Sequence, residues 1–166
     1  MSIKTFGDLR RHLGNLDLEP LTKQLASWFE GQLKAMPADV VALHLEWDLV
    51  GGDVDDEIVA DLYGFKPPGL DPEAPGSWDW SSDEDEQFQF IGMGAIWSES
   101  VEILTDDEVP AAEEQISATI DTIVRQGVEV SQNLAKRVAG TPPLRFFWSR
   151  DREPLREYSK SGTGGA

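Results

Sequence analysis

The chain has 166 residues, of which 40% are hydrophobic and 9% aromatic, and it carries a formal net charge of −17 without a single cysteine. This length suits one domain with a core of its own, and the apolar content excludes a generally disordered chain. The missing cysteine excludes disulfides, thiolate metal ligands and thiol nucleophiles within this sequence.

The first residues contain no apolar segment typical of a signal peptide, and no run approaches the roughly 18 apolar residues of a membrane span. Together with the missing cysteine, this composition predicts a cytoplasmic protein. We expect residues 1–158 to form a single α+β domain and residues 159–166, which are rich in glycine, to be a flexible C-terminal tail.

The elements expected first are two helices. Thr5 is a suitable N-cap for a short helix that ends near Gly14. Asp17 caps a longer helix, whose apolar residues recur at helical spacing until Pro37 interrupts the pattern. These apolar residues are Leu18, Leu21, Leu25, Trp28, Phe29, Leu33 and Met36.

Three strands are expected next. Residues 40–49 alternate between apolar and mixed positions, which predicts a half-buried strand with His44 on its wetter face. Residues 58–65 predict a second strand, antiparallel to the first, and residues 87–97 a third. The proline-rich segment 66–76 between them predicts a loop.

The C-terminal part predicts one long helix and one more strand. Residues 105–108 have capping-box form and open a helix over 109–139, in which Gly127 is the expected site of any kink. Residues 144–148 predict the last strand. The order ααβββαβ indicates an α+β fold, with a small, mostly antiparallel sheet of three to four strands and two main helices, 18–36 and 109–139, packed on one face.

Nearly all of the excess negative charge lies in the middle third of the chain. Residues 51–110 carry 17 acids and one base, a net charge of −16. A field of this sign repels phosphates and anionic lipids, so direct binding of nucleic acid or of a membrane surface is disfavoured. The same field suits a basic protein partner, although a purely solubilising surface also explains the charge.

No complete catalytic set is present. The only imidazoles are His12, which follows two arginines, and His44, which has carboxylates two and four residues further on. Such a pair can orient a base, but no GxSxG elbow supplies a serine, so a surface histidine is favoured. We therefore predict that the chain is not an enzyme and that it binds no cofactor.

A dedicated metal site is not predicted either. The segment "DVDDE" at 53–57 offers oxygen ligands suited to calcium or magnesium. Its third acid comes too early for an EF-hand loop, and the central glycine is missing. Loose binding of a divalent cation remains an alternative.

Two acidic stretches are the candidate binding sites, "GGDVDDE" at 51–57 and "SWDWSSDEDE" at 77–86. Tryptophans are preferred anchors of protein interfaces, and charges around them steer encounter. In the alternative interpretation the tryptophans fold back over the core and the acids only face solvent. The two interpretations are compatible, because one tryptophan can fold back while the other protrudes. Whether the two stretches form one surface or two stays open. The candidate partner-binding residues are Asp53, Asp55, Asp56, Glu57, Trp78, Asp79, Trp80, Asp83, Glu84, Asp85 and Glu86.

In size, charge and layout, and in these two stretches, the chain resembles the immunity proteins of bacterial polymorphic-toxin and type VI secretion systems, above all those that neutralise nucleases. The resemblance implies a tight inhibitory complex with a cognate toxin, in which the immunity protein covers the toxin's active site. Two other functions stay open. One is a regulatory or adaptor module, including a nucleic-acid-mimicking inhibitor of a DNA-binding protein. The other is an enzyme that uses clustered carboxylates with a divalent ion.

Overall fold

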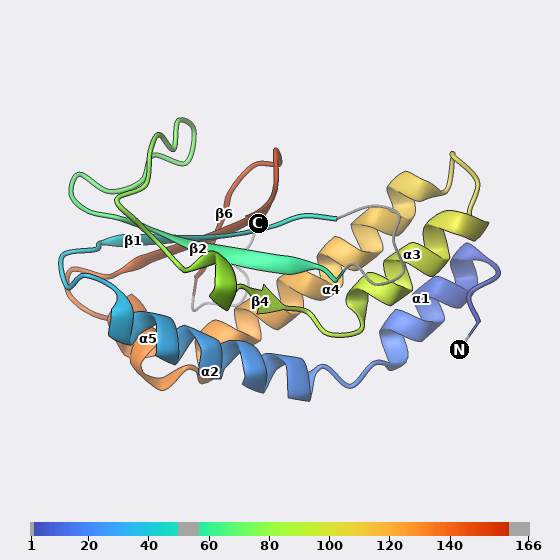
Figure 1. Cartoon of the computed structure of the whole chain (residues 1–166), viewed down its shortest axis with the longest axis horizontal. Helices are drawn as coiled ribbons and strands as arrows, with labels where there is room; N and C mark the ends of the chain where they lie inside the picture. Colours follow the sequence, from blue (N-terminus) through green and yellow to red (C-terminus); the bar gives the residue numbers. More distant parts are fainter. Residues whose placement is uncertain (1, 50–56, 160–166) are drawn as a thin grey trace.

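The computed structural model describes residues 2–49 and 57–159. Within these residues the chain forms five α-helices and a mixed six-stranded sheet (Figure 1). The predicted α+β class is confirmed, whereas the prediction of three to four strands is too low. No helix in the described ranges is both long and apolar enough to cross a membrane.

The two N-terminal helices form where the sequence predicts them, but the N-cap of the second is Leu18 and not Asp17. Helix α1 (Phe6–Asn15) begins at a capping box, in which Thr5 Oγ1 accepts the Asp8 N–H and the Asp8 carboxylate accepts the Thr5 N–H. Helix α2 (Glu19–Ala35) ends before Pro37, as expected from the missing N–H of proline.

Strand β1 (Ala42–Trp47) is the centre of the sheet. On one side it pairs antiparallel with β2 (Val59–Phe65), and on the other it pairs parallel with β5 (Arg145–Arg150). The last predicted strand thus lies beside the first and runs in the same direction. The sheet is therefore mixed, and its central pair departs from the predicted antiparallel arrangement.

Short strands complete the two edges. Strands β3 (Trp80–Ser81) and β4 (Phe88–Gln89) share the outer edge of β2, and a 3₁₀ turn (Glu84–Glu86) separates them. Strand β6 (Arg156–Glu157), which the sequence did not predict, covers part of the β5 edge.

The third predicted strand is largely wrong. Only Phe88–Gln89 pairs with the sheet, and helix α3 (Met93–Ile103) replaces the rest. Gly92 at the N-cap has φ of +93°, a left-handed conformation that glycine adopts without strain. This turn and the contacts of α3 with the rest of the fold outweigh the strand-like composition of an apolar run that lacks alternation.

The long C-terminal helix is broken at a different place from the expected one. Helix α4 (Val109–Val130) ends at the extended residue Ser131, and α5 (Gln132–Val138) follows. The carboxylate of Glu30 accepts hydrogen bonds from Ser131 Oγ and the Asn133 N–H, both at 2.9 Å, and so fixes the start of α5. No break occurs at Gly127. A Cβ there would lie 2.9 Å from Leu25 Cδ2, so this glycine allows α2 and α4 to pack closely.

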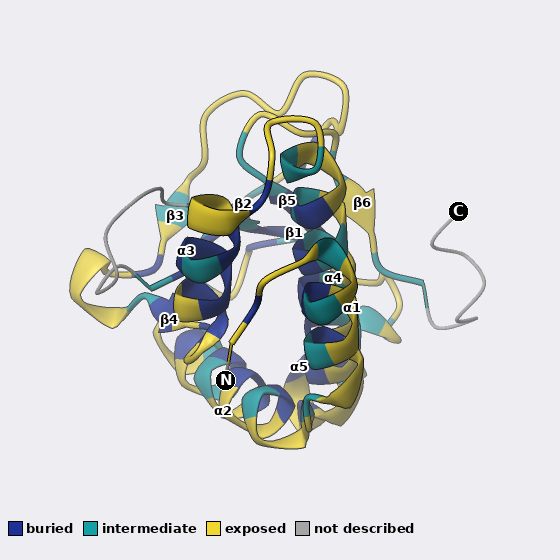
Figure 2. Ribbon diagram, turned by 90° about the vertical axis from the view of Figure 1, so that its right-hand side faces the viewer, coloured by how far each residue is buried: buried dark blue, intermediate teal, exposed yellow. Residues whose placement is uncertain are grey.

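The helices cover one face of the sheet. Helices α2, α4 and α5 pass beneath it, while the loop 66–79 and the β5–β6 connection rise on the opposite side (Figure 1). Figure 2 shows buried residues on the inward sides of α4 and α5 and exposed residues on their outward sides. Leu43, Leu45 and Trp148 are fully buried in the core between the helices and this face.

Candidate functional site

The face of the sheet that lacks helices carries acidic and aromatic side chains. Glu46 on β1 lies directly opposite Asp61 on β2, and His44 lies opposite Tyr63. Successive strand residues point to opposite faces, so all four side chains point away from the helices. We call the set Glu46, Asp61, Tyr63 and Trp78, whose ring stacks on Tyr63, the acidic sheet face.

Trp78 and Tyr63 form an aromatic stack on this face. Their ring centroids are 4.6 Å apart and the rings are inclined by 40°. Tyr63 is half-buried on its strand, whereas 55% of Trp78 is exposed. A fixed strand residue thus holds a large apolar ring in solvent, the arrangement that an interface anchor needs.

The carboxylates of this face have no basic partner. Within the described residues no lysine, arginine or histidine makes an ion pair with Glu46 or Asp61, and Asp61 accepts only the side-chain amide of Gln87, at 3.0 Å. Like charges directly opposite on a sheet are destabilising. Partial burial, together with the nearby charges of Asp151, Asp61 and Asp48, raises the pKa of Glu46.

The same environment affects the phenol of Tyr63. Burial, followed by the charges of Asp61, Glu46, Asp151 and Glu84, raises its pKa to about 12. The phenol therefore stays neutral near pH 7.

His44 corrects the expectation of a surface histidine. Only 7% of His44 is exposed, and its Nε2 lies 2.8 Å from Ser149 Oγ on β5. Burial lowers the pKa of His44 to about 4, so the imidazole is neutral near pH 7. Ser149 is only 5% exposed, and the pair therefore connects two strands rather than facing a substrate.

The two tryptophans of the stretch 77–86 differ in burial. Trp80 lies in β3 opposite Gly64 and packs against the core from its half-buried position. A Cβ at Gly64 would lie 3.2 Å from Trp80 Cε3, so the glycine makes room for this ring. Trp80 is folded in and Trp78 protrudes, the mixed arrangement that the sequence left open.

The acids near these tryptophans are partly used to shape the loop. The Asp79 carboxylate accepts the Lys66 N–H at 2.8 Å, and the Asp79 N–H donates to the Gly64 carbonyl at 2.9 Å. Asp83 and the 3₁₀ turn Glu84–Glu86 are exposed along the edge of β2. The Glu86 carbonyl accepts the Trp28 indole N–H at 2.6 Å, which ties this turn to α2 while leaving its carboxylates free to face solvent.

Glu57 is placed apart from these residues. Its carboxylate accepts the N–H groups of Gly92 at 2.9 Å and Gly94 at 2.6 Å, so it caps the start of α3. It precedes β2, whereas Trp80 pairs with the other end of that strand. The predicted partner contacts Asp53, Asp55 and Asp56 lie outside the described residues.

The sequence pattern did not mark Glu46, Asp61 or Tyr63 as candidate contacts. The alternation of each strand does indicate which residues share a face: Glu46 shares one with His44, and Asp61 shares one with Tyr63. Only the register of β1 against β2 brings the four together.

The described residues contain no group of three or more histidine, aspartate and glutamate side chains that could hold a metal ion. No protein-family model, curated protein or solved structure matches this chain.

Proposed function

We propose that this protein is an acidic inhibitory binding protein, an immunity protein that neutralises a basic, nuclease-type toxin by covering its active or substrate-binding surface. The observation that carries the proposal is the exposed Trp78, stacked on Tyr63 beside two carboxylates without basic partners. The partner is a basic protein, and we place the encounter in the cytoplasm.

The acidic sheet face supplies both kinds of contact that such a complex requires. Trp78 offers apolar area at low entropic cost, because its ring is already ordered by Tyr63. Glu46 and Asp61 repel one another in the free protein. A lysine or arginine of the partner would relieve this repulsion, so part of the binding free energy would come from an unfavourable contact in the unbound state.

The exposed acids at Asp83–Glu86 have a different role in the proposal. They lie at the outer edge of β2, and in the proposal they form the rim of the contact surface. Rim charges chiefly accelerate association through long-range attraction, which salt screens. We expect neutralisation of all four acids to slow association and to leave dissociation nearly unchanged.

A regulatory protein that imitates nucleic acid and inhibits a DNA-binding protein is the second candidate. The observation that favours it is the net charge of −16 in residues 51–110, which presents carboxylates where a nucleic acid presents phosphates. The two candidates differ in the captured partner and in gene order. An immunity gene is expected beside a toxin gene, whereas a regulator requires no such neighbour.

Catalysis is not part of the proposal. The His44–Ser149 pair is the one arrangement in the described residues that resembles a base beside a nucleophile. Both side chains are buried, and an imidazole with a pKa of about 4 is a poor general base near pH 7.

The test starts with affinity capture from the source cell, followed by identification and purification of the bound protein. Trp78→Ala should weaken binding of that partner about 30-fold, the equivalent of about 2 kcal/mol for an interface anchor, without lowering the melting temperature. Trp80→Ala is the matched control. It should lower the melting temperature and leave the affinity per folded molecule unchanged.

Two results would contradict the proposal. One is capture of an acidic or neutral partner. The other is a basic partner whose affinity is the same for Trp78→Ala as for the unaltered protein. If the association rate barely changes between low and physiological salt, the acids Asp83–Glu86 do not steer the partner and only keep the protein soluble.

A further inference from the structure

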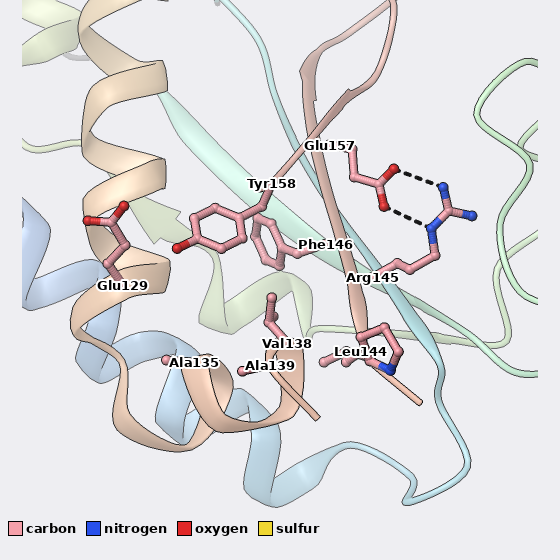
Figure 3. A pocket seen from close by; sticks show the side chains of 10 residues that line it. Glu129, Ala135, Val138, Ala139, Leu144, Arg145, Phe146, Glu157 and Tyr158 are labelled. Atoms are coloured by element: carbon pink, nitrogen blue, oxygen red, sulfur yellow. Dashed lines mark hydrogen bonds and ion pairs between the residues drawn. The ribbon is translucent and has the colours of Figure 1, made fainter. Parts of the chain in front are cut away.

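A cavity lies away from the acidic sheet face, between α5 and the edge of the sheet at β5 (Figure 3). Its volume is about 610 Å³, which falls within the roughly 300–1,000 Å³ typical of sites for small organic ligands. Most of its lining is apolar: Ala135, Val138, Ala139, Pro143, Leu144 and Phe146.

The sequence produces this cavity by placing small side chains opposite large ones. Ala135 and Ala139 lie one turn apart on and just after α5, and they leave space that longer side chains would fill. Phe146 on β5 and Tyr158 after β6 form the facing wall (Figure 3). The Tyr158 N–H donates to the Phe146 carbonyl at 2.8 Å, so the two rings are held on adjacent backbones.

At one side of the cavity the two charged side chains, Arg145 and Glu157, are already paired with each other. Arg145 donates to both carboxylate oxygens of Glu157, each at 2.8 Å, and its guanidinium lies 4.8 Å from the centroid of Phe147. An anionic ligand would have to break this two-pronged pair.

At the other side one carboxylate is left without a partner. Glu129 is exposed and makes no hydrogen bond or ion pair with any residue that the structure describes. Arg125, one turn earlier on α4, instead lies over the ring of Trp148, 5.0 Å from its centroid. The hydroxyl of Tyr158 points toward Glu129 (Figure 3).

We propose that this cavity binds a small amphipathic amine, with its apolar body against Val138, Leu144 and Phe146 and its ammonium group at Glu129. The Tyr158 hydroxyl oxygen is placed to accept a second hydrogen bond from the ammonium group. Burial and the charge of Glu129 raise the pKa of Tyr158, which keeps the phenol neutral. The site does not depend on the proposed toxin partner, because it uses none of the residues of the acidic sheet face.

The experiment compares three probes that share one apolar body: 4-phenylbutylamine, 4-phenylbutanol and 4-phenylbutyrate. Each is titrated into the purified protein with ¹³C-labelled methyl groups, and binding is followed through the NMR signals of Ala135, Val138, Ala139 and Leu144. We expect the amine to bind about fivefold more tightly than the alcohol, the effect of one charge pair worth about 1 kcal/mol. The butyrate should bind most weakly.

Three variants separate the local site from the general negative charge. Glu129→Gln should abolish the preference for the amine over the alcohol. Glu102→Gln removes the same charge from an exposed position on α3, outside the cavity lining, and should leave the preference intact. Ala139→Phe fills the cavity from an exposed position and should prevent binding of all three probes at an unchanged melting temperature.

The outcomes are decisive in either direction. Amine selectivity that disappears in Glu129→Gln and survives in Glu102→Gln supports the site. Equal affinities for amine and butyrate, equal losses in the two glutamine variants, or no methyl shifts with millimolar amine would each overturn it.

Discussion

The helix-covered face of the sheet and the acidic sheet face are built from alternate residues of the same strands. On β1, Leu45 is fully buried beneath the helices, while its neighbour Glu46 lies half-buried on the opposite face beside another carboxylate. The first face stabilises the fold by removing apolar area from water. The second face holds Glu46 and Asp61 opposite each other, and their repulsion destabilises the fold. Neighbouring residues of one strand therefore serve different purposes: Leu45 belongs to the core, and Glu46 belongs to the candidate contact surface.

The largest expected effect lies on the covered face. Leu45→Ala removes a fully buried side chain and should lower the free energy of unfolding by about 2–5 kcal/mol. The affinity of the folded fraction for its partner should stay unchanged. Urea denaturation together with a binding titration checks both, and a loss below about 1 kcal/mol would show that the core tolerates the cavity.

A smaller effect is expected from His44, a buried titratable group on the opposite face. The pKa of His44 falls from 6.5 to about 4 on folding, because burial disfavours the charged imidazole. The unfolded chain thus binds the proton more tightly. The stability that neutral His44 contributes is fully present above about pH 6.5 and is lost as the pH falls toward 4.

His44→Gln tests this expectation, since glutamine can still bond to Ser149. Between pH 7 and pH 4 the unaltered protein should lose roughly 2–3 kcal/mol more stability than the variant. Denaturation curves at pH 7, 5.5 and 4 measure the difference. Parallel loss in both proteins would mean that carboxylates alone cause the acid destabilisation.

Glu57 tests whether every acid of the middle third belongs to the contact surface. It was predicted as a partner contact, and its carboxylate caps α3 through Gly92 and Gly94. Glu57→Ala should lower the free energy of unfolding by about 1 kcal/mol, the usual worth of a helix cap, with affinity unchanged. Glu102→Ala, an exposed acid later in the same helix, is the control. Loss of affinity without loss of stability would instead show that Glu57 contacts the partner.

The smallest expected effect has the opposite sign. Because the pKa of Glu46 is raised on folding, its contribution to stability is fully present below the unfolded value of 4.5 and is lost as the pH rises through the raised folded value. At pH 7 Glu46→Gln should therefore stabilise the protein by about 0.5 kcal/mol, and this gain should vanish in acid. Weaker partner binding should accompany it; a destabilising substitution at pH 7 would contradict the proposed repulsion.

Local patterns predicted much of the scaffold. The Thr5 cap, the apolar stripe of α2 and the antiparallel pair at 40–49 and 58–65 were all correct, because each depends on residues that are close in sequence. Helix α3 was missed because the carboxylate at its start comes from Glu57, 35 residues before Gly92. The break at Ser131 was missed for the same reason, since Glu30 lies on a distant helix.

The candidate site was predicted only in part. Composition indicated that Trp78 and its acidic neighbours were unusual, and the exposure of Trp78 agrees with an anchor. Composition did not separate Trp78 from Trp80, because that difference arises from the space that Gly64 leaves. Nor did it bring Asp61 to Glu46, because the meeting of two acids requires a strand register.

The parallel pairing of β1 with β5 has a consequence for the order in which the protein folds on the ribosome. Ala42 lies opposite Arg145, so the central strand gains its second neighbour only after about a hundred further residues have been synthesised. Such distant pairing slows folding and leaves an open strand edge in the meantime. A nascent chain that stalls before residue 145 would expose β1, apolar on its core face, to pairing with other chains. Chaperone dependence should therefore be greatest in the interval before the last long strand emerges.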